Sequence, residues 1–292
     1  MAVFEHTYGP YEGQLTPQWS RFLVIPRHAY RRVFKSKIFT AFFALSFVCP
    51  LVMAVIIYLH HNINALTLME LQPASIVPIN NVFFRVYTMI QSTIAFLLTV
   101  LIGPVLISRD LTNNALPLYL SRPFSRFEYL AGKASVLVIL LSAITWVPGL
   151  LLFLFQSYLE GFGWFRFNLW IANAIFLSCL LWIVLLTLMS LALSAWIKWR
   201  MAASGAVFAS FIIPAAVTTI ISELFRTPWS QMFNPSMLMQ VITDQLFRFS
   251  NPFQLDEDLL LPAWAGWVGF LGLLLFCVWL LTRKVRAYEV VK

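Results

Sequence analysis

The sequence predicts an all-α integral membrane protein with six transmembrane helices. The chain is 60% hydrophobic and only 11% charged, whereas a soluble domain carries about 25% charged residues, and its mean hydropathy is +0.81. Six apolar runs are long enough to cross a bilayer, which takes roughly 20 residues. The short alternating segments of a β-barrel do not occur, and helices satisfy their own backbone hydrogen bonds in lipid. The expected spans are 38–59, 84–107, 134–158, 169–197, 203–222 and 263–282.

The distribution of charge predicts which side of the membrane each loop faces. With six spans both termini share a side, which holds six basic residues in 21–37, four in 108–133, two in 198–200 and four after 282, so 16 of the 20. That side has five of the 12 acidic residues, and the opposite side has the other seven with four basic residues. The positive-inside rule therefore places both termini in the cytoplasm. Orientation and anionic lipid account for the basic excess, so no nucleic-acid partner is expected.

The first 37 residues are expected to form a cytoplasmic segment with an amphipathic interfacial helix. From Trp19 to Lys35, apolar residues recur at helical spacing and cations fill the positions between them. Pro26 could open this helix at its first position. Such a helix lies in the inner interface with its cations toward the headgroups, either as a simple anchor or as a lever that joins an internal partner to the first span. The first apolar run follows this basic segment, so a cleaved signal peptide is not expected.

Residues 38–292 are expected to form the transmembrane domain, with a cytoplasmic loop at 108–133 and an extracytoplasmic loop at 222–261. The outer loop mixes acidic and apolar residues, and Pro235 could open a short helix that runs through Phe247. Its apolar content favours short helices that dip into or lie on the outer leaflet. Arg85, at the outer mouth of the second span, is expected to snorkel to water.

Polar residues and prolines inside the spans are candidates for a substrate pathway. Such residues tend to face a bundle interior or a cavity, although interhelical hydrogen bonds and packing would use the same residue types. The pathway candidates are Gln91, Thr99, Pro214 and Thr218.

No catalytic constellation can be assembled from the sequence. The four histidines are not spaced as H-E-x-x-H, and no G-x-S-x-G is present. Gly132-Lys133 resembles the end of a phosphate-binding loop, but Phe127 stands where that motif needs glycine and Ala134 where it needs Ser or Thr. We therefore expect no catalytic site, no metal site and no bound cofactor in this chain.

The polar, basic stretch 108–133 is the segment through which we expect an energy source outside the membrane to act on this chain. Its prolines break helices, its Asn and Ser residues suit caps and turns, and its apolar residues need a cover outside the bilayer. The features that carry a resemblance are Asp110, the leucine cluster Leu116, Leu118 and Leu120, the run Ser121-Arg122-Pro123-Phe124-Ser125-Arg126, and the closing Gly132-Lys133.

This pattern resembles the coupling loop of ABC-2 type permeases, the transmembrane subunits of ABC exporters. The family typically has an acidic residue, Gly-Thr, a leucine cluster, Ser-x-Pro-x-Ser-Arg and a Gly-Lys that opens the third span. Asn114-Ala115 replaces Gly-Thr here, and Pro117 lies inside the leucine cluster. Asn tolerates a left-handed conformation nearly as well as Gly, so Asn114 is expected to preserve the turn that Gly makes in the family motif.

The resemblance implies a permease without its own ATPase site, in a bacterial cytoplasmic (inner) membrane. Two such subunits would pair, as a homodimer or heterodimer, and each would dock a separate ABC ATPase that binds ATP and magnesium. The second and fifth spans would be the pathway walls. The implied docking residues are Asp110, Asn114, Leu116, Tyr119, Ser121, Arg122, Pro123, Ser125, Arg126 and Phe127.

The expected function is therefore ATP-driven export of an apolar or amphipathic substrate. The alternative is a membrane anchor or scaffold that docks the same ATPase but moves no solute. A secondary transporter would need ion coupling, and no acidic residue lies deep in a span. An intramembrane enzyme would need the catalytic set that is missing.

Overall fold

A computed structural model describes residues 24–62, 78–112, 126–197, 199–250 and 261–284 of the chain. These residues are almost entirely helical, and no strand occurs among them. The elements are α1 (Val24–Val33), α2 (Lys37–Leu45), α3 (Val48–His61), α5 (Asn81–Thr112), α7 (Arg126–Ile144), α8 (Trp146–Glu160), α9 (Phe162–Trp196), α10 (Arg200–Phe225), the 3-10 helix η3 (Pro228–Phe233), α11 (Pro235–Leu246) and α12 (Ala263–Lys284).

Six helical stretches of the described chain are long and apolar enough to cross a membrane, which confirms that part of the predicted fold class. Most of their ends lie within a few residues of the ends of the six predicted apolar runs. The third stretch begins earlier than predicted, because it includes the end of the basic loop. The stretches are Lys37–His61, Asn81–Pro104, Phe127–Glu160, Phe162–Trp196, Arg200–Phe225 and Ala263–Lys284.

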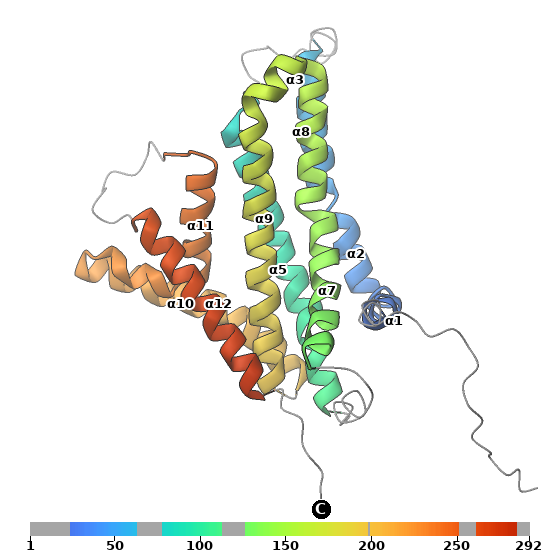
Figure 1. The fold of residues 1–292 in the computed structure, drawn as a ribbon, viewed down its shortest axis with the longest axis vertical. Coiled ribbons are helices and arrows are strands. Elements are labelled where there is room, and N and C mark those ends of the chain that lie inside the picture. The colour runs from blue at the N-terminus through green and yellow to red at the C-terminus, as the bar shows by residue number, and fades with distance from the viewer. Residues whose placement is uncertain (1–23, 63–77, 113–125, 198, 251–260, 285–292) are drawn as a thin grey trace, which may run out of the picture.

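The long helices α5 and α9 form the centre of the structure. The main hydrophobic core lies along them and includes Leu98, Ile183 and Leu186, all essentially inaccessible to solvent. Figure 1 shows α8 and α9 running side by side along the long axis of the molecule. Gly161 turns the chain between these two helices at φ +97°, a conformation that favours glycine.

Two of the six stretches are broken helices. The first consists of α2 and α3, which meet at Ser46-Phe47, and the third consists of α7 and α8, which meet at Thr145. A proline follows each break, Pro50 in α3 and Pro148 in α8. Proline has no backbone N–H to donate to the carbonyl four residues earlier, so it interrupts the hydrogen-bond ladder at that point.

The N-terminal helix α1 packs against α7, far along the chain. Pro26 is the third residue of α1, so it does not open the helix at its first position as expected. The hydroxyl of Tyr30 lies 3.5 Å from the carbonyl oxygens of Ser135 and Val136, to which it donates. Burial raises the pKa of Tyr30 to about 12.

Helix α10 differs from the other long helices in its direction. In Figure 1 it runs across the direction shared by α8 and α9. It packs on α5 and on η3, and its opposite side leaves Ile213, Ile220 and Leu224 at least 60% exposed. An apolar surface of this kind needs a cover of lipid or protein.

The basic stretch 108–133 is partly helical. Helix α5 continues to Thr112 and α7 begins at Arg126, so the first and last residues of the predicted loop belong to these two helices. Lys133 is buried, with its ammonium group 5.6 Å from the ring centroid of the buried Tyr129. The closing Gly132-Lys133 is therefore part of the helical domain.

Candidate functional site

A pocket of about 330 Å³ opens between α5, α9, α10 and α11, and it is the candidate functional site. Ligand pockets typically have about 300–1,000 Å³ and a mostly apolar lining with a few polar groups. The lining residues are Thr88, Met89, Ser92, Thr93 and Phe96 of α5, Trp182 of α9, Phe211 and Ile212 of α10, and Ser236, Met239, Gln240, Thr243 and Asp244 of α11.

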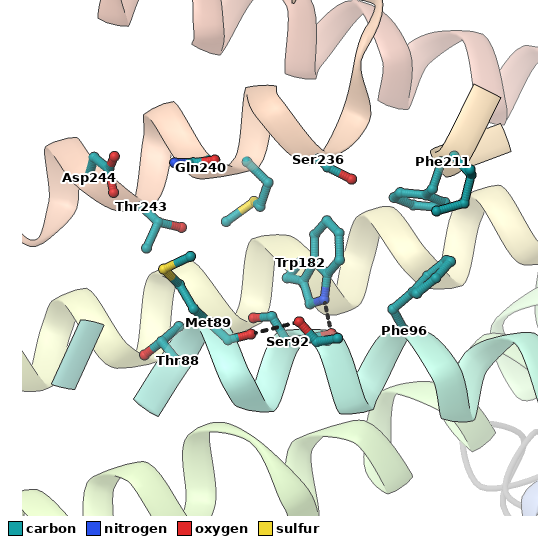
Figure 2. Close-up of a pocket in the computed structure, with 13 residues that line it drawn as sticks. Thr88, Met89, Ser92, Phe96, Trp182, Phe211, Ser236, Gln240, Thr243 and Asp244 are labelled. Carbon is teal, nitrogen blue, oxygen red and sulfur yellow. Dashed lines mark hydrogen bonds between the residues drawn. The ribbon is translucent and has the colours of Figure 1, made fainter. Parts of the chain in front are cut away.

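The pocket is amphipathic. Figure 2 shows Phe96, Trp182 and Phe211 gathered at one end and Thr88, Thr243 and Asp244 at the other. The rings of Phe96 and Phe211 lie 4.8 Å apart between centroids, and the Trp182 ring meets Phe211 edge to face at 5.6 Å. Such ring contacts make a preformed surface for a flat or apolar group.

Several polar groups of the pocket are already committed to the protein. The indole nitrogen of Trp182 donates to the carbonyl of Ser92 at 2.8 Å. The Thr88 and Thr93 hydroxyls donate to the Phe84 and Met89 carbonyls of their own helix. These two hydroxyls retain oxygen lone pairs, so they can accept hydrogen bonds from a ligand.

Helix α11 covers the pocket, and the local sequence determines where it begins. The side chain of Asn234 accepts hydrogen bonds from the backbone N–H groups of Ser236 and Met237, at 3.1 and 3.2 Å. Pro235 occupies the first turn, where its missing N–H has no cost. This N-cap and proline start a helix that ends at Leu246, close to the predicted end at Phe247.

The far end of α11 is joined to α5 by an ion pair. Nε of Arg85 lies 2.5 Å from Oδ1 of Asp244, and the guanidinium also stacks over the ring of Phe249 at 4.0 Å. The amide of Asn81 donates to the carbonyl of Phe247 at 2.8 Å. Arg85 is only 8% exposed, so the expectation that it snorkels to water was wrong: its charge is compensated inside the protein.

Helices α9 and α12 also hold α11 in place. Arg248 takes a left-handed conformation (φ 51°) just after α11, and its guanidinium stacks over the ring of Trp170 at 4.5 Å. The indole of Trp267 in α12 donates to Oε1 of Gln245 at 2.8 Å. The cover of the pocket is therefore joined to three other helices at its C-terminal end.

The four pathway candidates belong to α5 and α10, two of the helices that line this pocket, but none of the four is a lining residue. Gln91 and Thr99 are fully buried in α5, and the Thr99 hydroxyl donates to the Ala95 carbonyl of its own helix. Pro214 and Thr218 lie in α10, where the Thr218 hydroxyl donates to the Pro214 carbonyl at 2.7 Å. A pathway role for these four residues stays a prediction.

Most of the expected docking residues fall outside the described residues. Asn114, Leu116, Tyr119, Ser121, Arg122, Pro123 and Ser125 all lie there. Of the remainder, Asp110 belongs to the last turns of α5, Arg126 is the first residue of α7, and Phe127 is 80% exposed.

Neither the pocket nor the Arg85–Asp244 pair was predicted from the sequence. The polar run Gln91-Ser92-Thr93 was a signal for a polar face in the second span, but which of these residues faces a cavity depends on packing. Arg85 and Asp244 are 159 positions apart, and no local pattern links them.

No protein-family model and no curated protein matches this sequence.

Proposed function

We propose that this chain is the transmembrane permease subunit of an ATP-driven exporter of the ABC-2 type. The observation that supports transport best is the amphipathic pocket between α5, α9, α10 and α11. Its aromatic end suits the apolar part of a substrate, and its hydroxyl, amide and carboxylate groups suit a polar end. The pocket contacts both the second and the fifth apolar stretch, which the resemblance implies as pathway walls.

A source of energy outside the chain is part of the proposal. The loop pattern from Asp110 to Arg126 supports docking of a separate ABC ATPase, with both termini and this loop in the cytoplasm. The exposed apolar side of α10 supports a cover of lipid or of a second permease subunit. ATP-driven closure of two ATPases would then change the packing of the bundles and release the substrate outward.

Charge reversal in the loop tests the proposal directly. In the double variant Arg122→Glu/Arg126→Glu, copurification of an ATPase subunit with the permease is expected to fall at least about tenfold, because reversing both charges replaces attraction by like-charge repulsion at the interface. ATP-dependent transport into sealed vesicles should fall with it. Unchanged association and transport would contradict the proposal, and association without transport in the unaltered protein would favour the scaffold alternative.

Narrowing the pocket tests the site independently of docking. Gln240→Trp places a bulky ring at an exposed position of the lining, so ATP-dependent transport of a fluorescent amphiphile is expected to fall about 10-fold or more. ATPase copurification should stay unchanged. The control is Leu275→Trp, which places the same ring at an exposed position of α12 outside the lining. Equal transport in both variants would show that this pocket is not on the substrate path.

A further inference from the structure

The two prolines of the broken stretches each leave a carbonyl without its helical partner. Proline cannot donate to the carbonyl four residues before it. The carbonyl affected by Pro50 belongs to Ser46, and the carbonyl affected by Pro148 belongs to Ile144. In a lipid environment an unsatisfied backbone carbonyl is expensive, because no water is present to replace the lost donor.

One side chain of α5 donates to both of these carbonyls. Nε2 of Gln91 lies 2.9 Å from the oxygen of Ser46 and also donates to the oxygen of Ile144. Gln91 is completely buried. A carboxamide nitrogen carries two hydrogens, so a single Gln can serve two acceptors at once, whereas a carboxylate could serve neither.

A second residue of α5 strengthens the contact at the α7–α8 break. Tyr87 lies one helical turn before Gln91, and its hydroxyl donates to the carbonyl of Thr145 at 2.7 Å. That carbonyl also accepts the backbone N–H of Gly149 at 3.1 Å. Tyr87 is fully buried and packs beside Gly149, where an added Cβ would lie 2.8 Å from the tyrosine ring. The same face of α5 therefore contacts the third stretch over a full turn.

We propose that Gln91 is a positioning residue whose amide joins α5 to the proline breaks of two other stretches. Its side-chain N–H groups take the place of the two backbone N–H groups that Pro50 and Pro148 lack. The second stretch is thereby joined to the first and to the third at the same point. The neighbouring Thr88 and Ser92 line the pocket. Gln91 thus fixes the part of α5 that forms one wall of the pocket, without itself contacting the contents of the pocket.

The test is a double-variant cycle on the detergent-solubilised protein. Gln91→Met keeps the size of the side chain but removes both donors, and the thermal midpoint is expected to fall by about 5 °C or more. Pro148→Ala supplies an N–H for the carbonyl of Ile144. In the presence of Gln91 this change is expected to be neutral or destabilising, because the carbonyl already has a donor. In the Gln91→Met background the same change should raise the midpoint, and this reversal of sign is the signature of the proposal.

A matched control separates this role from general burial of an amide. Gln156 is buried in α8 of the third stretch, and its amide donates to the side chain of Glu160 at 3.4 Å. Gln156→Met should combine additively with Pro148→Ala. If Gln91→Met cannot be isolated, the yield of folded double variant relative to the single variant is the readout, and recovery supports the proposal. An unchanged midpoint in Gln91→Met, or the same effect of Pro148→Ala with and without Gln91, would overturn it. None of these measurements depends on transport or on an ATPase.

Discussion

Asp244→Asn is expected to lower the free energy of unfolding by about 3 kcal/mol, because it leaves the buried guanidinium of Arg85 without its counter-charge. The side chain of Arg85 is 10% exposed and that of Asp244 25% exposed. The contact with the Phe249 ring, whose centroid lies 4.0 Å from the guanidinium carbon, remains and offsets part of this loss.

Substitution of the other partner, Arg85→Met, is expected to lower the free energy of unfolding by less, about 1–2 kcal/mol. Asp244 is partly exposed to the pocket, so water can hydrate the carboxylate once its partner is removed. The measurement is a chemical or thermal unfolding curve in detergent for both single variants and for the exchange Arg85→Asp/Asp244→Arg, which should recover part of the loss. Equal losses for the two single variants, or no recovery in the exchange, would contradict this assignment.

Gly103→Ala is expected to destabilise the centre of the bundle by about 1–3 kcal/mol, because it overpacks the contact between α5 and α9. A Cβ at this position would lie 1.8 Å from Oγ and 2.8 Å from Cβ of Ser190. Rotation of the hydroxyl can relieve the first contact but not the second, so the two central helices must move apart.

A compensating substitution makes the Gly103 prediction specific. Ser190→Gly removes both close atoms, and the next neighbour, Cδ1 of Leu137, is at an ordinary 3.5 Å. The double variant Gly103→Ala/Ser190→Gly should therefore unfold at a higher temperature than Gly103→Ala alone. Gly272→Ala in α12 is the control, since a Cβ there meets nothing within 4 Å and should be tolerated. A Gly103→Ala protein as stable as the control would show that the helices are not in this close contact.

The prediction of α11 illustrates what local sequence carries. Asn234 caps the helix and Pro235 suits its first turn, and both effects act within a few residues of each other. The number and approximate limits of the long apolar stretches follow in the same way, because the length of an apolar run is a property of consecutive residues. The Pro26 expectation was wrong, since Val24 and Ile25 before it are already helical.

The role of Gln91 shows what local sequence does not carry. A glutamine inside an apolar span predicts a polar contact, but a cavity and a buried hydrogen bond require the same residue type. Only the packing of α5 between the first and third stretches identifies the carbonyls of Ser46 and Ile144 as its partners.

The sequence by itself determined that this is a helical protein with six stretches able to cross a membrane, and where those stretches and α11 lie along the chain. Apolar length, caps and prolines act locally, so they can be read in order. The tertiary structure decided that Arg85 meets Asp244, that Gln91 serves two proline breaks, and that Trp182 and Phe211 share a pocket. These contacts join surfaces of nearly uniform apolar character, where only the relative placement of the helices selects the partners.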